Sequence, residues 1–583
     1  MKTGRHNTPL AILATLLSMP ALSHGESTDR ITNQQTQTIL DSADQHSQSP
    51  GVSPIRRIER PIQQPRVNER HVSQREFDGR NNNHQDIEMG AAETPLRRVI
   101  PSQYADGISS LAGADRASPR LISNIVNAQT ASIENPIAAS DYLWQWGQFL
   151  DHDIGLTDGV DPAEPADIYI PTGDTYFDPN STGTASMSFN RSIYDSHSAT
   201  NKPREQINEI TSWIDASNVY GSDTARATAL RSLDGTGRLK TSDGDMLPFN
   251  TEGLANAGGS SDALFLAGDV RANEQIGLTS MHTLFMRNHN WWANHYQQKD
   301  PRMSGEMLYW SARQMVEAEM QIITYNEYLP LLLGENTIRP YQGYNPQANG
   351  RITNLFAHGA YRYGHTALSP QLLRLDAEGD ETEYGHLALR NAFFAPYRLT
   401  TEGGIEPILR GLAHQVHQGI DIYVIDDVRN FLFGNPGSGG FDLAALNIQR
   451  GRDHGLPSYN DVREGFGLPR IKRLSEISTD LEVQTRIAQA YDSIDNIDLW
   501  VGGLAEDPVP GALVGELLQR VMRVQFEALR DADRFWYQNV LAKEKLQKVE
   551  STTLADIIRR NTTINKEISN TVFLVPKKSK NKR

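Results

Sequence analysis

Two stretches of this chain carry apolar residues three or four positions apart, the spacing at which side chains share one face of an α-helix. They are Leu308, Ala312, Met315, Val316, Met320 and Ile323, and then Leu513, Leu517, Val521, Val524 and Ala528. Residues 162–190 and 339–351 are instead dense in Gly, Pro, Asp and Asn, which favour loops. The pattern predicts a mainly α-helical chain with long irregular connections.

The two ends of the chain differ from the rest. Residues 1–23 combine a basic start, the apolar stretch Leu10–Leu17 and the small residues Ala21 and Ser23, which is typical of a signal peptide. Residues 24–73 are rich in Gln, Asn and Ser, so we expect a flexible leader or propeptide. Residues 576–583 form a basic tail. Because no later segment reaches the roughly 18 to 20 apolar residues of a membrane span, we expect a soluble protein that is secreted or periplasmic.

Composition narrows the chemistry. The 583 residues include no cysteine, which excludes disulfides, iron–sulfur clusters, thiol nucleophiles and thiolate-bound haem or zinc. The formal net charge of -15 argues against nucleic acid as a partner, because phosphate binding needs concentrated Lys and Arg. Length alone favours about three or four domains.

The segment 143–153 is the most informative stretch. If it is helical, Gln148 and His152 lie four positions apart and project from one face, with Asp151 and Asp153 on either side of the histidine. A histidine in such a segment, taken by itself, is more often structural than catalytic.

That segment is the first of a series of motifs that follow one another along the chain. The others are Thr211–Gly221, Arg271–Gln275 with Leu278–Leu284, Tyr361–His365, Leu446–Arg450 with Arg452–Gly455, Asp498–Gly503 and Asp533–Trp536. Together they resemble the animal haem peroxidases of the peroxidase–cyclooxygenase superfamily. The resemblance implies one mainly α-helical domain over residues 74–575, with a haem between central helices, in place of several domains.

Peroxide cleavage needs a base that takes a proton and returns it to the departing oxygen, and a neutral imidazole does this near neutral pH. The resemblance gives that role to His152. It gives Arg271 the role of a guanidinium that stabilises charge on the leaving oxygen. Gln148 resembles the distal glutamine that binds pocket water or halide.

The iron needs a fifth ligand, and without cysteine this is His, Met or Tyr, of which His suits a peroxidase. The motif match selects His365 and places Asn447 as the hydrogen-bond acceptor of its other ring nitrogen. Because an amide withdraws the proton less than a carboxylate does, we expect less imidazolate character than in plant-type peroxidases. Arg362 and Arg450 resemble residues near the haem propionates, where guanidinium groups suit carboxylates.

A predicted extended loop places alternate residues on one side, where they would offer hydroxyl, main-chain carbonyl and carboxylate oxygens. These residues are Thr211, Trp213, Asp215 and Ser217. Those ligands suit calcium, although composition alone favours an ordinary turn. The similarity to the family's calcium loop favours the ion. Asp153 would complete the site and tie it to the distal helix.

Asp151 and Glu274 match the two carboxylates that esterify haem methyl groups in many relatives, so the resemblance implies covalently attached haem b. Leukocyte-type members have methionine after this glutamate, whereas this chain has Gln275, which argues against easy chloride oxidation. The remaining histidines of the motifs, His282, His289, His358 and His454, are expected to be structural.

The resemblance predicts a haem peroxidase that reduces hydrogen peroxide and oxidises bromide, iodide, thiocyanate or phenolic donors. One alternative is a fatty-acid dioxygenase of the same superfamily, but those enzymes carry a tyrosine three residues before the proximal histidine, where this chain has Arg362. The other alternative is a calcium-binding matrix or adhesion protein that keeps the fold without the chemistry.

Overall fold

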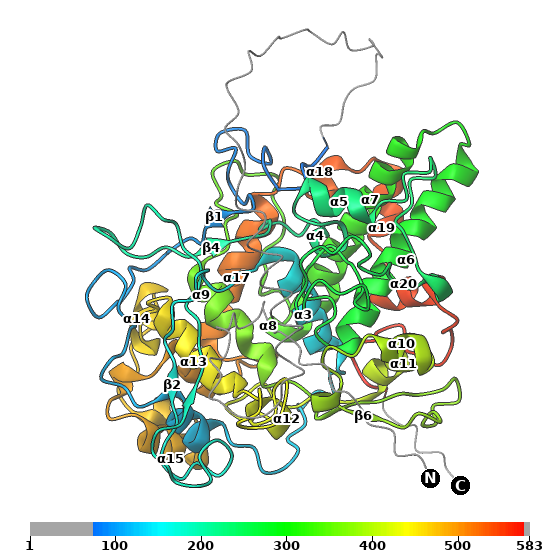
Figure 1. The fold of residues 1–583 in the computed structure, drawn as a ribbon. Coiled ribbons are helices and arrows are strands. Elements are labelled where there is room, and N and C mark those ends of the chain that lie inside the picture. The colour runs from blue at the N-terminus through cyan, green and yellow to red at the C-terminus, as the bar shows by residue number, and fades with distance from the viewer. Residues whose placement is uncertain (1–73, 577–583) are drawn as a thin grey trace, which may run out of the picture. The chain divides into compact units, whose positions relative to one another are not determined.

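The computed structural model describes residues 74–576, which are mostly helix and loop (Figure 1). Among them, the α-helices longer than ten residues are α3 (Tyr142–Ile154), α6 (Ile276–Lys299), α7 (Gly305–Ile323), α13 (Leu443–Asp453) and α17 (Glu516–Asp531). The shorter α-helices are α2 (Pro119–Ile122), α4 (Ser217–Tyr220), α5 (Thr224–Leu230), α8 (Leu329–Leu333), α9 (Asn354–His358), α10 (Tyr397–Thr401), α11 (Glu406–His414), α12 (Asp426–Arg429), α14 (Tyr459–Gly465), α15 (Leu481–Ala490), α16 (Leu499–Ala505), α18 (Tyr537–Val540), α19 (Lys543–Val549) and α20 (Leu554–Asn561).

Other turns of helix and a few short strands complete the secondary structure. Two π-helices are η1 (Ser123–Asn127) and η3 (Thr324–Tyr328), and the 3-10 helices are η2 (Asp243–Asp245), η4 (Ala360–His365), η5 (Leu389–Asn391), η6 (Leu474–Glu476) and η7 (Ile494–Asn496). The strands pair antiparallel as β1 (Thr94–Pro95) with β4 (Ile207–Asn208), β2 (Ile168–Tyr169) with β3 (Ser186–Met187), and β5 (Gln371–Leu372) with β6 (Leu387–Ala388). Thr94 faces Asn208, Ile168 faces Met187 and Gln371 faces Ala388.

Helix α3 lies inside the protein. Every residue of it is buried except Gln148 and Asp151, and both of these face a cavity. Phe149 packs against Phe285 of α6 with 5.0 Å between ring centroids, and Trp146 packs against the same ring at 5.7 Å. Burying such a side chain contributes about 1.5–3 kcal/mol. This packing fixes the rotation of α3 and therefore the direction of its polar residues.

The loop that leads into α6 is held tightly against α4. A Cβ at Gly268 would collide with the carbonyl oxygen of Ser217, so only glycine fits there. The loop ends where the side chain of Gln275 caps α6 by accepting the Gly277 N–H at 2.6 Å. Arg271 and Glu274 lie between these two fixed points.

The helical pattern of the sequence is matched in one stretch and partly wrong in the other. The stretch from Leu308 to Ile323 forms α7 as predicted. Helix α17 begins at Glu516, so Leu513 precedes it, and Val524 is 40% exposed instead of packing in the core. Residues 339–351 contain no helix or strand, but the predicted loop 162–190 includes the β2–β3 pair. Strands of two residues are too short to leave an alternating pattern.

The described residues belong to one compact unit. The predicted signal peptide (1–23), leader (24–73) and all but the first residue of the basic tail lie outside the described residues. Within residues 74–576, no helix is both long and apolar enough to cross a membrane.

Candidate active site

A cavity with an empty volume of about 1310 Å³ lies between α3, η4 and α13. It collects residues that are far apart in the sequence: the predicted site residues on its wall are Gln148, Asp151, His152, Arg271, Glu274, Arg362, His365 and Asn447. The structure therefore brings together every predicted distal and proximal residue except Arg450.

His152 is the buried base on one side of the cavity. It is 2% exposed, and its Nε2 lies 3.8 Å from Glu274 Oε2. Burial, followed by the positive charge of Arg271, holds the pKa of His152 well below its ordinary value. The imidazole is therefore neutral at neutral pH and free to accept a proton.

Asp269 is a site residue that the sequence analysis missed. Its carboxylate accepts two side-chain hydrogen bonds from Arg271, at 2.9 Å from Nε and 2.8 Å from Nη2, and one from the Arg271 main-chain N–H at 2.8 Å. Asp269 Oδ1, which accepts from Arg271 Nε, also lies 3.3 Å from His152 Nδ1, although that contact is not aligned as a hydrogen bond. The only sequence feature that could have indicated this role is the position of Asp269 two residues before Arg271.

The charge of Asp269 and Arg271 is fixed. Burial opposes ionisation of Asp269, but the charge and hydrogen bonds of Arg271 outweigh it, so the pKa of Asp269 lies below its ordinary value. Arg271 is 3% exposed, and its Nη2 also donates to the Gly155 carbonyl at 2.9 Å. The guanidinium of Arg271 cannot move away from His152 without breaking its two side-chain hydrogen bonds to Asp269.

Asp151 and Glu274, the predicted haem-ester residues, both line the cavity. Burial raises the pKa of Asp151 to about 6 and that of Glu274 to about 8. Glu274 Oε2 is buried without a hydrogen-bond partner, and Asp151 Oδ2 lies 3.8 Å from Arg271 Nη1. An unpartnered buried oxygen on the cavity wall is where a bound group is expected.

Gln148 belongs to a small network of amides. Gln275 Nε2 donates to Gln145 Oε1 at 2.8 Å and to Gln148 Oε1 at 3.1 Å. Gln275, which stands where leukocyte-type members have methionine, thus holds Gln148 in place. No local sequence pattern indicated this contact.

His365 lines the cavity at the end of η4. Its Nδ1 lies 2.7 Å from Asn447 Nδ2, and Asn447 Oδ1 accepts a hydrogen bond from Arg362 Nη1 at 3.1 Å. The partner is the predicted one, but the amide turns its nitrogen, not its oxygen, to the ring. If His365 Nε2 binds a metal through its lone pair, the ring proton must sit on Nδ1. That Nδ1–H then needs an acceptor, so metal binding requires the opposite amide orientation, with Nδ1–H donating to Asn447 Oδ1.

Arg362 faces the cavity without a carboxylate partner. Its side chain donates to the Ala357 carbonyl, Asn447 and His358 Nδ1, and no described acid lies within ion-pair distance of it. Burial, and then Arg450, lowers the pKa of Arg362 to about 10. A guanidinium that lines a cavity and has no acidic partner suits a carboxylate from a ligand. His358, expected to be only structural, also lines the cavity.

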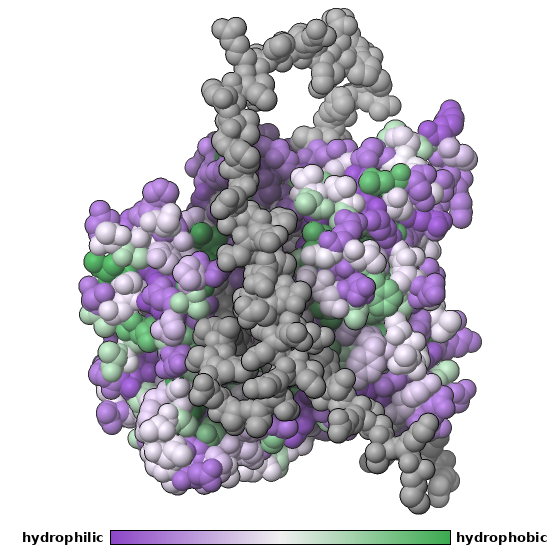
Figure 2. Space-filling model, viewed as in Figure 1, coloured by the Kyte–Doolittle hydropathy of each residue, from purple (hydrophilic) through white to green (hydrophobic). Residues whose placement is uncertain are grey.

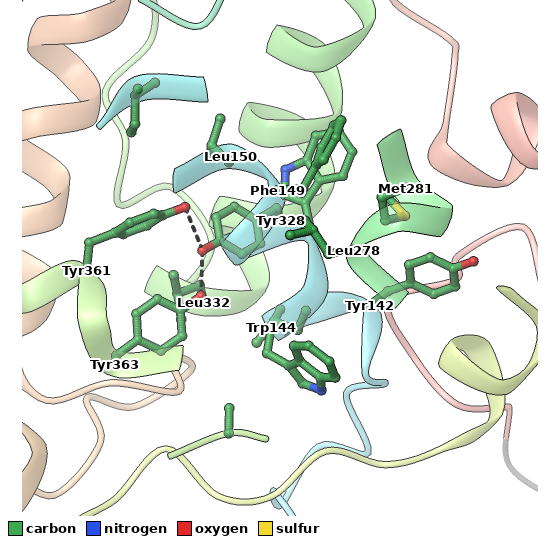
Figure 3. Packing of buried hydrophobic residues seen from close by; sticks show 14 of the residues in the cluster. Tyr142, Trp144, Phe149, Leu150, Leu278, Met281, Tyr328, Leu332, Tyr361 and Tyr363 are labelled. Atoms are coloured by element: carbon green, nitrogen blue, oxygen red, sulfur yellow. Dashed lines mark hydrogen bonds between the residues drawn. The ribbon is translucent and has the colours of Figure 1, made fainter. Parts of the chain in front are cut away.

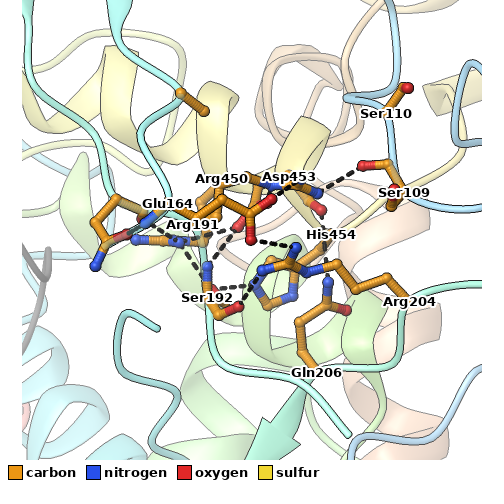
Figure 4. Close-up of polar contacts among 12 residues, drawn as sticks. Ser109, Ser110, Glu164, Arg191, Ser192, Arg204, Gln206, Arg450, Asp453 and His454 are labelled. Atoms are coloured by element: carbon orange, nitrogen blue, oxygen red, sulfur yellow. Dashed lines mark hydrogen bonds and ion pairs between the residues drawn. The ribbon is translucent and has the colours of Figure 1, made fainter. Parts of the chain in front are cut away.

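Arg450 does not line the cavity and lies in a buried polar network (Figure 4). Its Nη1 donates to Ser192 Oγ at 2.7 Å and to the Asn190 carbonyl at 3.1 Å, and it pairs with Asp453 at 3.1 Å. Ser192 Oγ also contacts His454 Nε2 at 2.7 Å. A role for Arg450 at the propionates stays a prediction.

The predicted calcium ligands come together where the end of α3 meets the start of α4. Ser217 Oγ donates to the Asp153 carbonyl oxygen at 2.8 Å and to Asp153 Oδ1 at 3.0 Å, and Thr211 Oγ1 donates to Asp215 Oδ1 at 3.1 Å. Trp213 lies buried in the same loop, with its indole N–H 3.3 Å from the Gly79 carbonyl.

The electrostatics of this cluster fit a cation. Burial, and then the charge of Asp215, raises the pKa of Asp153 well above its ordinary value. Burial also raises the pKa of Asp215 to about 6, and Asp215 Oδ2 has no hydrogen-bond partner. No group of three or more His, Asp or Glu side chains that could hold a metal occurs within residues 74–576, so hydroxyl and carbonyl oxygens would have to complete the coordination.

Comparison with known proteins identifies the family. The family model described as animal haem peroxidase matches residues 74–573. The chain belongs to the animal haem peroxidase family. Peroxinectin A of Dictyostelium discoideum is 36% identical over 509 residues, which cover 84% of this chain and 93% of that protein. Peroxidasin homologues match a similar share of this chain, but the match covers only 38% of the Homo sapiens protein.

Solved structures agree with this assignment. Peroxidase A from Dictyostelium discoideum aligns with a TM-score of 0.80 at 33% identity, covering 86% of this chain and 99% of its own. A fatty acid alpha-dioxygenase from Arabidopsis thaliana aligns with a TM-score of 0.74 at 20% identity, over 87% of this chain and 84% of its own. At that identity only the fold is shared. The predicted helical fold and haem-dependent peroxidase activity are therefore confirmed.

Proposed function

We propose that this peroxidase cleaves hydrogen peroxide with His152 as proton carrier, Arg271 as electrostatic stabiliser and His365 as the ligand of a haem b iron. The observation that supports it is that a neutral imidazole and a fixed guanidinium line the same cavity as a second histidine, His365. When bound, the haem supplies the iron that receives the peroxide and the electrons that reduce it.

The side chains divide the work by charge. Neutral His152 would accept a proton from one oxygen of the peroxide and return it to the other oxygen, which leaves as water. Arg271 keeps its charge throughout, because Asp269 pairs with it, and it stabilises the negative charge that grows on the leaving oxygen. Gln148 faces the same space and would orient a water molecule or an incoming halide.

The carboxyls on the cavity wall support covalent attachment of the haem. Asp151 and Glu274 both face the space the haem would fill, and Glu274 has an oxygen with no protein partner. We therefore assign them to ester bonds with haem methyl groups. Arg362 would hold a propionate, because it lacks an acidic partner among the described residues.

Calcium would bind Asp153, Thr211, Trp213 (through its main-chain carbonyl), Asp215 and Ser217. Its role would be to join α3 to the loop before α4, because Asp153 directly follows the distal histidine. As donors we propose bromide, iodide, thiocyanate or phenols, since Gln275 replaces the methionine linked to easier chloride oxidation. Export through the predicted signal peptide belongs to the same proposal.

The decisive test is a His152→Ala variant of the haem-loaded protein, compared with His289→Asn. His289 is also buried but does not line the cavity. We expect peroxide-dependent iodide oxidation to fall by about 10²–10⁴-fold in the first variant and little in the second. Equal rates for wild type and His152→Ala would refute the assignment.

A further inference from the structure

A cluster of three tyrosines stands at the cavity wall. Tyr361 and Tyr363 line the cavity a few residues before His365. The Tyr328 hydroxyl donates to the Tyr361 hydroxyl at 3.1 Å and lies 2.5 Å from the Tyr363 hydroxyl (Figure 3). All three side chains are buried. The proposed peroxide chemistry uses none of them.

Aromatic contacts continue from this cluster to the protein surface. The ring of Tyr361 lies 5.6 Å from that of Phe526, which lies 6.3 Å from Tyr325. Tyr325 shares the π-turn η3 with Tyr328. Its ring lies 5.0 Å from Trp536, and Trp536 lies 5.8 Å from Tyr341, which is partly exposed. Phe526 is the one ring of this path that is hard to oxidise.

We propose that this path carries electrons inward from Tyr341, so that the protein oxidises phenolic groups on macromolecules that cannot enter the cavity. Electron transfer weakens steeply with distance, and here neighbouring rings are in contact. In a chain without cysteine, tyrosine and tryptophan are the side chains that lose one electron most easily. The inference rests on the proposed peroxidase chemistry, which supplies the oxidant.

The reaction balances with hydrogen peroxide as the oxidant. One peroxide and two phenols give two waters and two phenoxyl radicals, so each phenol loses one electron and one proton. The two protons and two electrons reduce the peroxide. A tyrosine on the path that has given up its electron regains it from the next ring outward, and finally from the external phenol.

The surroundings of Trp536 and Tyr341 are compatible with electron transfer through them. The Trp536 indole N–H donates to Gln538 Oε1 at 3.1 Å, and the Tyr341 hydroxyl donates to Asn539 Oδ1 at 3.0 Å. Arg530 lies over the Tyr341 ring at 5.4 Å, but it pairs with Asp531 at 2.8 Å. The pair adds little net charge that would oppose removal of an electron from the ring.

The test uses the haem-loaded full chain with Trp536→Phe, Tyr341→Phe and, as a control, Tyr309→Phe. Tyr309 is buried, packs on Tyr220 and His289 away from the path, and has a hydroxyl without a hydrogen-bond partner. Each protein receives peroxide with a nitroso spin trap, and the labelled residue is located by peptide mass spectrometry. Rates are measured with iodide and with phenol coupled to a large dextran.

We expect trapped radical at Tyr341 in wild type and control, and loss of that label in Trp536→Phe. Oxidation of dextran-bound phenol should drop in both path variants, while iodide oxidation stays at the wild-type rate. Unlabelled Tyr341 in wild type, or an unchanged dextran-phenol rate in Tyr341→Phe, would overturn the path. Failure of wild type with iodide would overturn the peroxidase assignment as well. Tyr341→Phe changes a partly exposed position, so the test does not depend on whether Trp536→Phe folds.

Discussion

Asp269 holds the guanidinium of Arg271 in a two-point fork, and one oxygen of the same carboxylate lies 3.3 Å from the imidazole of His152. A single buried acid therefore positions both groups proposed to act on peroxide. The loop that carries it cannot shift easily, because Gly268 is pressed against the main chain of α4. The distal site depends on this support as much as on its reactive residues.

Replacing Asp269 with Asn should disable the enzyme without emptying its haem site. The neutral amide cannot form the charged fork, so Arg271 loses its fixed position, and misplacement of this kind costs about 10²-fold in rate. Stopped-flow measurement of the reaction with peroxide tests this, with haem content as the control. A rate within twofold of wild type (about 0.4 kcal/mol) would show that Asp269 is not needed for positioning.

The pH dependence should follow the lowered pKa of His152. The base must be neutral, so activity is lost only as pH falls through that pKa, which burial and Arg271 hold well below 6.5. We therefore expect kcat/KM for peroxide to stay constant on lowering the pH from 7 through about 6.5. In Arg271→Gln, loss of a neighbouring positive charge raises the pKa of His152, so the acid limb should move to higher pH. A wild-type limb centred at 6.5 or above contradicts this.

The two ester candidates should control how firmly the haem is held. After peroxide treatment, acid–organic extraction should leave haem on wild type, less on Asp151→Ala or Glu274→Gln, and none on the double variant. Mass spectrometry of the peptides around residues 151 and 274 checks the bonds directly. Complete extraction from treated wild type would show that the haem is not covalently attached.

Calcium should stabilise the fold around α3. Chelation should lower the melting temperature and distort the haem spectrum, because Asp153 would then be left as a buried acid beside the charge of Asp215 with no cation between them. Asp215→Asn should show a weaker response to added calcium than wild type. Identical melting curves with and without chelator, in protein whose metal content has been checked, would contradict the site.

Much of the site could be predicted because its residues lie in continuous motifs. Gln148 and His152 share a face of α3, and His365 ends a recognisable segment. Asp269 was missed because an acid beside an arginine is common, and only the fold shows that its other side meets His152. The contact between Arg362 and the Asn447 amide joins residues 85 positions apart, so it left no local signal. Val524 was misplaced because helical spacing does not tell which residues of a face meet a neighbour.

The central claim is that His365 and His152 enclose an iron porphyrin that reacts with peroxide. An absorption spectrum of the purified protein, produced with ample haem and recorded before and after one equivalent of hydrogen peroxide, tests it most directly. We expect a strong Soret band that shifts rapidly with peroxide in wild type and slowly in His152→Ala. A colourless protein, or a Soret band that peroxide leaves unchanged, would contradict it.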